Sequence, residues 1–318
     1  IKYSIFGVVN IHTDIKSRLP GYLVALFTLA VAFFAVFFPD RCSLSVRVGL
    51  DLFCKRLLPA LFPMAVISGV FCKMGKIPGI PTKIIARLAR ISEKSAVAFV
   101  FGAVAGFPIG AMLVGRLYKN GEIDREEGER MLGLCSVASP AFLISAVGIN
   151  MFGNIRVGIL LYGVQLAVTV LLLFLTAGRV KYLRKTEETC KTALPTVGCL
   201  VDAVAQAAVS MLSVAAFVTF FSVVCNMLGA LLPDGNNRLR AITGGFLEIG
   251  CGMNELSCFP EKTALPAAAL FAGWSGLSVH MQVMSVSGEL SLKRYFLQKV
   301  IIAAACSLLV FSFCAFFC

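Results

Sequence analysis

The sequence predicts an all-α polytopic integral membrane protein, and three observations support this fold class. Of the 318 residues, 58% are hydrophobic and 14% are charged, whereas a soluble chain needs about 25% charged residues to cover its surface. The mean hydropathy is +0.87. Apolar runs of about 20 residues, enough to cross a hydrocarbon core of roughly 30 Å as a helix, alternate with short charged clusters. A soluble fold is therefore excluded.

The first apolar run, 20–38, is expected to be an extra N-terminal transmembrane helix inside a segment 1–43. No small-residue cleavage site follows the run, so we interpret it as a retained anchor and not as a signal peptide. The rest of the chain is expected to divide into two inverted-topology repeats joined by a basic linker. The expected units are the first repeat 44–178, the cytoplasmic linker 179–198 and the second repeat 199–318.

The inverted arrangement follows from counting crossings between three loops that are rich in lysine and arginine, at 73–94, 179–191 and 293–299. The positive-inside rule places all three in the cytoplasm. Three apolar segments separate each loop from the next, and an odd number of crossings cannot return the chain to the same side. One segment in each half must therefore enter and leave by one face. The glycine-broken stretches 96–117 and 241–262 are the expected re-entrant hairpins, because their glycines and proline interrupt helical structure.

Each half is expected to repeat one order of elements: an amphipathic lead, a span, a hairpin, a span with scattered polar residues, and a plain span. The ranges are 44–56, 57–72, 96–117, 130–153 and 155–178 in the first half, and 197–208, 209–232, 241–262, 263–285 and 296–317 in the second. About seven full crossings and two hairpins result. Inverted halves with matching broken helices are typical of secondary transporters, although a duplicated scaffold without transport would share the order.

The net charge of +12 comes from an excess of lysine and arginine, which we interpret as marking cytoplasmic loops and contacting anionic lipid. We do not interpret it as a sign of nucleic-acid binding. The 12 cysteines contain no CxxC pair and are expected to be small core residues, so no metal site and no disulfide framework is predicted. The sequence contains no GxxxxGK[ST], HExxH or GxSxG motif. We therefore expect a protein that is not an enzyme and needs no cofactor.

Three ionisable residues lie inside apolar segments, where a charge costs about 2.5 to 3.5 kcal/mol and usually faces a cavity or a partner. They are Glu248, Glu255 and His280. Glu248, in the second hairpin, is expected to bind and release a proton or cation during transport. His280 is a relay or substrate contact, or alternatively a packed interior residue. Glu255 is interpreted as interfacial and solvated.

Uncharged polar residues occupy the same slot in each half, in CSVASPAF and in GWSGLSVHMQ. Half-helices beginning near the glycines of the two hairpins would direct backbone N–H groups to the midplane, which suits an anionic solute. The same small residues could instead serve close helix packing. The predicted solute-binding residues are Gly106, Pro108, Gly110, Ser136, Ser139, Glu248, Gly250, Ser275, Ser278, His280 and Gln282.

The run GFPIGAMLVGRLYKNGEIDREEGERMLGLCSVASPAFLISAVGINMFG, with GGFLEIGCG and GWSGLSVHMQV, resembles sporulation integral membrane proteins of the YlbJ type. These belong to the wider nucleoside-recognition, or Gate, domain group. The resemblance extends from about residue 44 to the end of the chain. The family's acidic hairpin motif falls on Glu248. Its other two motifs fall on Gly106, Phe107, Pro108 and Gly110, and on Gly276, Leu277, Ser278 and Gln282. The family's Asn-Ser-Gly-Pro-like run is replaced here by Ser136, Val137, Ala138, Ser139 and Pro140.

The resemblance implies a transporter in the mother-cell-derived outer forespore membrane that moves dipicolinic acid towards the forespore. Its implied partners are the lipid bilayer, a small anionic solute, a coupling proton or cation, and further copies of the chain or other sporulation membrane proteins. Two alternatives stay open. The wider group implies nucleoside or cation transport, and a protein of another class would be a non-transporting assembly factor of the spore envelope.

Overall fold

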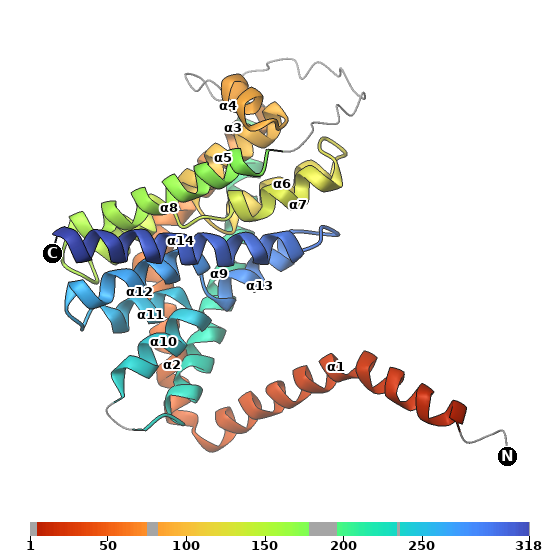
Figure 1. Cartoon of the computed structure of the whole chain (residues 1–318), viewed down its shortest axis with the longest axis vertical. Coiled ribbons are helices and arrows are strands. Elements are labelled where there is room, and N and C mark those ends of the chain that lie inside the picture. Colours follow the sequence, from red (N-terminus) through yellow and green to blue (C-terminus); the bar gives the residue numbers. More distant parts are fainter. Residues whose placement is uncertain (1–4, 75–81, 178–195, 234–235, 318) are drawn as a thin grey trace.

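The computed structural model describes residues 5–74, 82–177, 196–233 and 236–317, and every regular element within these ranges is a helix (Figure 1). This confirms the all-α fold class. Three helices in the described ranges are long and apolar enough to cross a membrane, or up to four if the pair Gly21–Phe37 and Pro39–Leu57, bent by 108°, forms one span. The three are α8 (Ile155–Leu175), α9 (Val197–Gly229) and α14 (Lys293–Phe317).

Two long helical rods pack against each other at the centre of the fold. The first comprises α2 (Pro39–Leu52), the π-helix η1 (Phe53–Leu57) and α3 (Leu58–Met74), and the second is α9. A Cβ added to Gly49 would lie 2.8 Å from Thr219 Cα, and one added to Gly69 would lie 3.2 Å from Ala203 Cβ. Residue numbers therefore rise along one rod as they fall along the other, so the rods are antiparallel. The stretch 44–56, expected as an amphipathic lead, is thus part of a rod that packs on α9.

The two predicted hairpin segments both fold back on themselves. They consist of α5 (Glu93–Ala105) with α6 (Ile109–Lys119), and of α10 (Asn237–Leu247) with α11 (Ile249–Leu256). A Cβ on Gly110 would lie 2.8 Å from Gly102 Cα, and one on Gly244 would lie 3.2 Å from the Gly252 nitrogen. Residues eight apart in a continuous helix are separated by about 12 Å. Each segment therefore turns back at a break halfway between two glycines, near Gly106 in one and at Glu248 in the other. Their orientation relative to a bilayer stays a prediction.

The expected spans 130–153 and 263–285 are not continuous helices, which corrects the sequence interpretation. The first is divided into α7 (Arg125–Cys135) and the π-helix η2 (Ala141–Ile149), and the second into α12 (Glu261–Trp274) and α13 (Leu277–Val286). In the second span, Ser275 (φ 78°) and Gly276 (φ 84°) adopt left-handed backbone conformations that end a helix. In the first, Pro140 lacks an N–H donor and starts the new helix at η2. The count of about seven full crossings therefore included spans that the structure interrupts.

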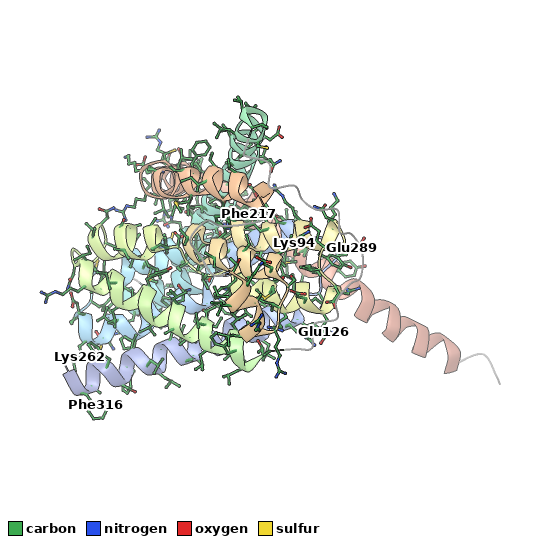
Figure 2. The ribbon with its side chains drawn as sticks, turned by 90° about the horizontal axis from the view of Figure 1, so that it is seen from above. Lys94, Glu126, Phe217, Lys262, Glu289 and Phe316 are labelled. Atoms are coloured by element: carbon green, nitrogen blue, oxygen red, sulfur yellow. The ribbon has the colours of Figure 1, made fainter. Side chains whose placement is uncertain are left out.

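The charged connector between α6 and α7 joins the two halves on one side of the body. Lys94, Glu126 and Glu289 lie on this side, whereas Lys262 and Phe316 lie on the opposite side (Figure 2). α14 therefore runs across the body between these sides. The remaining elements are α4 (Thr82–Ala89) and α1 (Ile5–Phe37), which extends away from the body (Figure 1).

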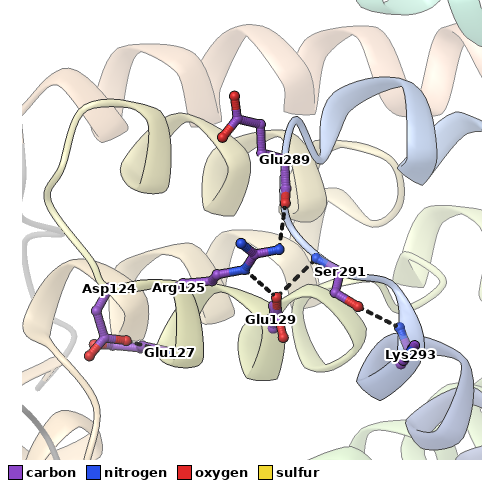
Figure 3. A network of polar contacts seen from close by, with 7 residues as sticks. All are labelled: Asp124, Arg125, Glu127, Glu129, Glu289, Ser291 and Lys293. Carbon is purple, nitrogen blue, oxygen red and sulfur yellow. Dashed lines mark hydrogen bonds and ion pairs between the residues drawn. The ribbon is translucent and has the colours of Figure 1, made fainter.

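Within the connector, a polar network ties α7 to the turn before α14 (Figure 3). Asp124 caps α7 by accepting from the Glu127 N–H at 2.7 Å. Arg125 Nε donates to Glu129 Oε1 at 2.8 Å, and a second guanidinium nitrogen donates to the Glu289 carbonyl at 3.2 Å. The Ser291 N–H also donates to Glu129 Oε1, at 3.1 Å. The first turns of α7 are therefore a joint between the halves.

We predict that Gly110→Ala prevents stable folding of the first hairpin. The new methyl group would meet the backbone carbonyl of Cys135, which also lies against Gly102, so α7 would have to move. Overpacking of this kind costs about 3 kcal/mol. The measurement is the melting temperature of the purified protein in detergent. The matched control is Gly163→Ala in α8, where no atom lies within 4 Å and alanine favours the helix by about 1 kcal/mol. Equal melting temperatures for the two variants would contradict the hairpin packing.

We also predict a pH-dependent contribution from Glu129. The hydrogen bond from Arg125 lowers the pKa of Glu129 below its ordinary value. A carboxyl with a lowered folded-state pKa stabilises the fold above its unfolded pKa of about 4.3, and this contribution is lost as the pH falls through the folded pKa. Glu129→Gln should therefore lower stability by about 1 kcal/mol at pH 7 and have little effect near pH 3. Thermal unfolding at both pH values tests this, with the exposed Glu126→Gln as the control.

Candidate solute-binding site

A small closed cavity of about 20 Å³ lies where the helix breaks of both halves meet. A volume of this size holds about one water molecule. Side chains from both rods, both hairpins and both broken helices line it. The lining residues are Leu57, Leu61, Phe107, Ser139, Phe142, Val214, Val218, Glu248, Ile249, Gly250, Val279 and Gln282. The predicted residues Ser139, Glu248, Gly250 and Gln282 therefore do converge on one site.

In each half, the break of the hairpin contacts the break of the following helix pair. The Phe107 N–H donates to the Val137 carbonyl at 3.0 Å, and Gly106, at φ 80°, lies against Ser139. In the second half, a Cβ on Gly276 would lie 3.0 Å from the Ile249 nitrogen. The predicted Gly106, Pro108 and Gly110 thus shape the first hairpin, and its side chain at the cavity is that of Phe107.

The cavity is lined by the first turns of half-helices or by the residues just before them. Ser139 and Phe142 flank the start of η2, Ile249 and Gly250 begin α11, and Val279 lies in the first turn of α13. Phe107 lies just before α6. Helix N-termini carry partial positive charge and unpaired N–H groups. At two of these helix starts the cavity side chains act as caps, because the Cys251 N–H donates to Glu248 at 2.7 Å and the Phe142 N–H donates to Ser139 Oγ at 3.1 Å.

Glu248 is the charged group of the cavity, and it is 2% exposed. It is the N-cap residue of α11, and its Oε2 accepts from the Cys251 N–H at 2.7 Å. A carboxylate at a helix N-terminus is stabilised by the helix dipole and by this hydrogen bond. The structure therefore gives Glu248 a capping role that the sequence interpretation did not include, in addition to its place at the cavity.

Two other predicted residues, Ser136 and Ser275, contact a buried lysine. Lys299, on α14, is fully buried, and its ammonium donates to the Ser136 carbonyl and, at 3.0 Å, to Ser275 Oγ. Ser136 and Ser275 do not line the cavity. The sequence interpretation placed Lys299 in a cytoplasmic loop with Lys293 and Arg294, and the structure corrects this. Its position inside a helix that is otherwise apolar was the available signal.

His280 lies in an aromatic cluster and not at the cavity. Its Nδ1 is 2.7 Å from the Tyr295 hydroxyl, and its ring centroid is 4.3 Å from that of Trp274. Ser278 accepts from Gln282 Nε2 at 3.3 Å, which orients the amide beside the cavity. Gln282 Oε1 is buried and has no hydrogen-bond partner among the described residues. Gln282 therefore offers a free acceptor at the site.

Two open clefts lie along α9 on either side of the cavity. The first has a volume of about 1110 Å³, contains Arg116 and Lys119, and contacts α9 between residues 205 and 213. The cavity contacts α9 at residues 214 and 218. The second cleft, of about 690 Å³, contacts α9 between residues 225 and 230. Its walls carry Glu255 and Asp51 together with four cationic residues, Arg41, Lys55, Arg56 and Arg240. Cleft, cavity and cleft thus follow one another along a single helix.

These features define the class of the protein: a polytopic helical membrane protein in which broken helices surround a small, mostly apolar cavity that carries Ser139, Glu248 and Gln282 and lies between two clefts. Over 329 aligned positions, the chain is 24% identical to the sporulation integral membrane protein YlbJ of Bacillus subtilis (strain 168), covering 90% of this chain and 80% of that protein. This similarity supports a YlbJ-type assignment and a membrane role in sporulation. No family model and no solved structure matches the chain.

The capping role of Glu248 can be measured separately from any transport role. Glu248→Gln keeps an oxygen that can accept from the Cys251 N–H, so its stability should stay close to that of the wild type. Glu248→Ala removes the cap and should cost about 1 kcal/mol. Thermal unfolding in detergent at pH 7 compares the two variants. If both variants unfold at the same temperature, Glu248 is not a cap of energetic importance.

Proposed function

We propose that the protein carries a small anionic metabolite, dipicolinate by its resemblance to YlbJ-type proteins, from the mother cell across the outer forespore membrane towards the forespore. The observation that carries the proposal is the convergence of half-helix N-termini on one closed cavity between two clefts. Oriented N–H groups at helix N-termini bind carboxylates without a dedicated cation. Discontinuous helices use their ends in this way in secondary transporters.

Glu248 determines which charge the cavity accepts. An ionised carboxylate repels an anion about 4 Å away by about 4 kcal/mol at an effective dielectric constant of 20. A proton or a cation bound at Glu248 removes this repulsion. We therefore propose that the anion and a coupling proton or cation occupy the site together, which links movement of the solute to the protonation or occupancy of Glu248.

The clefts supply the route to the cavity. Each carries basic side chains that attract an anion, among them Arg116 at the first cleft and Arg240 at the second. A cavity of about 20 Å³ is too small for a dicarboxylate, so the solute requires a state in which the cavity is wider and joined to one cleft. Opening to one cleft at a time is the alternating access expected of this class.

One observation favours cation transport as a second candidate. With Glu248 ionised, its carboxylate, Ser139 and the free oxygen of Gln282 offer oxygen ligands around the cavity. Oxygen ligands suit hard cations. The two candidates therefore differ in whether the carboxylate assists an anion as a protonated group or binds a cation as an ionised one.

The test is Glu248→Gln in a sporulating host, with dipicolinate measured in the mother cell and in the spore. The amide cannot ionise, so coupling through this residue is lost, and we expect dipicolinate to accumulate in the mother cell at a normal protein level. The control is Glu261→Gln, an exposed carboxylate whose hydrogen bond from Asn154 an amide oxygen can also accept. Normal spore dipicolinate in both variants would reject anion transport and favour an assembly role.

A further inference from the structure

Lys299 is the most deeply buried charged side chain of the described residues, and it contacts both halves of the protein. It lies on α14 of the second half and donates to the Ser136 carbonyl in the first half. It also donates to Ser275 Oγ, at the break between α12 and α13. The same ammonium therefore bonds to one helix break in each half.

The burial of this ammonium needs an electrostatic explanation. Among the described residues no carboxylate forms an ion pair with Lys299. Ser136 and Ser275 are the residues at which α7 and α12 end. The C-terminus of a helix carries partial negative charge, so two such ends can stabilise one ammonium in place of a carboxylate. The titratable groups around it are His280 of α13 and, on α14, Tyr295 and Cys306.

These contacts determine how the cavity is built. Three residues after Ser136, Ser139 lines the cavity, and Gln282 lines it from the helix that begins after Ser275 and Gly276. Holding the C-terminal ends of α7 and α12 therefore also fixes where η2 and α13 begin. Movement of one half relative to the other would separate Lys299 from Ser136, since the contact joins the halves.

We propose that Lys299 is a positioning residue that acts as a charged latch and keeps the central cavity closed. Opening of the cavity requires the ammonium to release at least one of its two helix ends. This proposal rests on the proposed function only for the identity of the solute. Closure of the cavity is a property of the protein itself and can be measured without a solute.

The experiment measures access to Glu248 by its rate of reaction with a hydrophobic carbodiimide, using the purified full chain in detergent and mass spectrometry of the labelled peptide. Glu248 is 2% exposed, so the closed state should react slowly. The reaction rate also depends on whether the carboxyl is protonated. The rate is therefore followed from pH 8 to pH 4, and variants are compared at the low-pH plateau, where the carboxyl is protonated in each of them.

Lys299→Met removes the latch and should raise the plateau rate about tenfold. Ser275→Ala keeps the charge, removes one of its two partners, and should raise the rate by a smaller factor of about three. The matched control is Gln298→Leu, which replaces a buried neighbour that packs on α7 at Gly133 and donates to the Arg130 carbonyl, not to Ser136 or Ser275, and it should react at the wild-type rate.

Plateau rates equal to the wild type in both latch variants would overturn the proposal. If Lys299→Met does not accumulate as folded protein, Ser275→Ala alone decides, and a wild-type rate in that variant overturns the latch. An equally raised rate in Gln298→Leu would also overturn it, because general loosening would then explain the result. The two proposals can fail separately. Faster labelling of Glu248 in the latch variants would support the latch, and normal spore dipicolinate in Glu248→Gln would reject the transport proposal.

Discussion

The architecture depends on one constraint: backbone groups freed by a helix break inside an apolar interior must find partners within the protein. Some of these partners lie at another helix break, and others are side chains that cap or contact the break. The Phe107 N–H meets the Val137 carbonyl, the Glu248 carboxylate caps α11, and Lys299 binds the Ser136 carbonyl. The hairpins and the divided helices are therefore mutually required. Removing one break would leave polar groups of its partner unpaired.

The glycine pattern predicted the two segments that fold back because this signal is local, whereas the charge parity of the loops stays a prediction. Glycines eight apart allow close contact, as between Gly102 and Gly110, and this spacing is visible in the sequence. The sequence argument placed Ser139, Glu248 and Gln282 in one central region, and all three line the cavity, while the repeat relation of the two halves stays a prediction. The sequence could not predict which groups each of these side chains contacts, because the contacts depend on how α13 and η2 are rotated about their axes. His280 consequently faces aromatic rings and not the cavity.

Two features escaped sequence reasoning for physical reasons. The divisions at 136–140 and 275–276 barely change hydropathy, and a serine followed by proline or glycine also occurs in kinked helices that stay continuous. Whether such a site ends a helix depends on a tertiary partner for the freed carbonyls. Lys299 supplies that partner, yet its neighbours Lys293 and Arg294 make it resemble a loop residue. Because Lys299 resembles a loop residue in the sequence, neither of the two helix breaks that it contacts could be predicted.

The distribution of helix ends also separates charge within the protein. C-terminal ends of α7 and α12 face the ammonium of Lys299, whereas N-terminal ends of α11, α13 and η2 face the cavity. Because these C-terminal ends lie against Lys299 and their residues Ser136 and Ser275 do not line the cavity, they add little field there. The potential there is then set by the N-termini and by Glu248. Under the proposed function, the protonation of one carboxyl group would therefore decide whether an anion or a cation is preferred in the cavity.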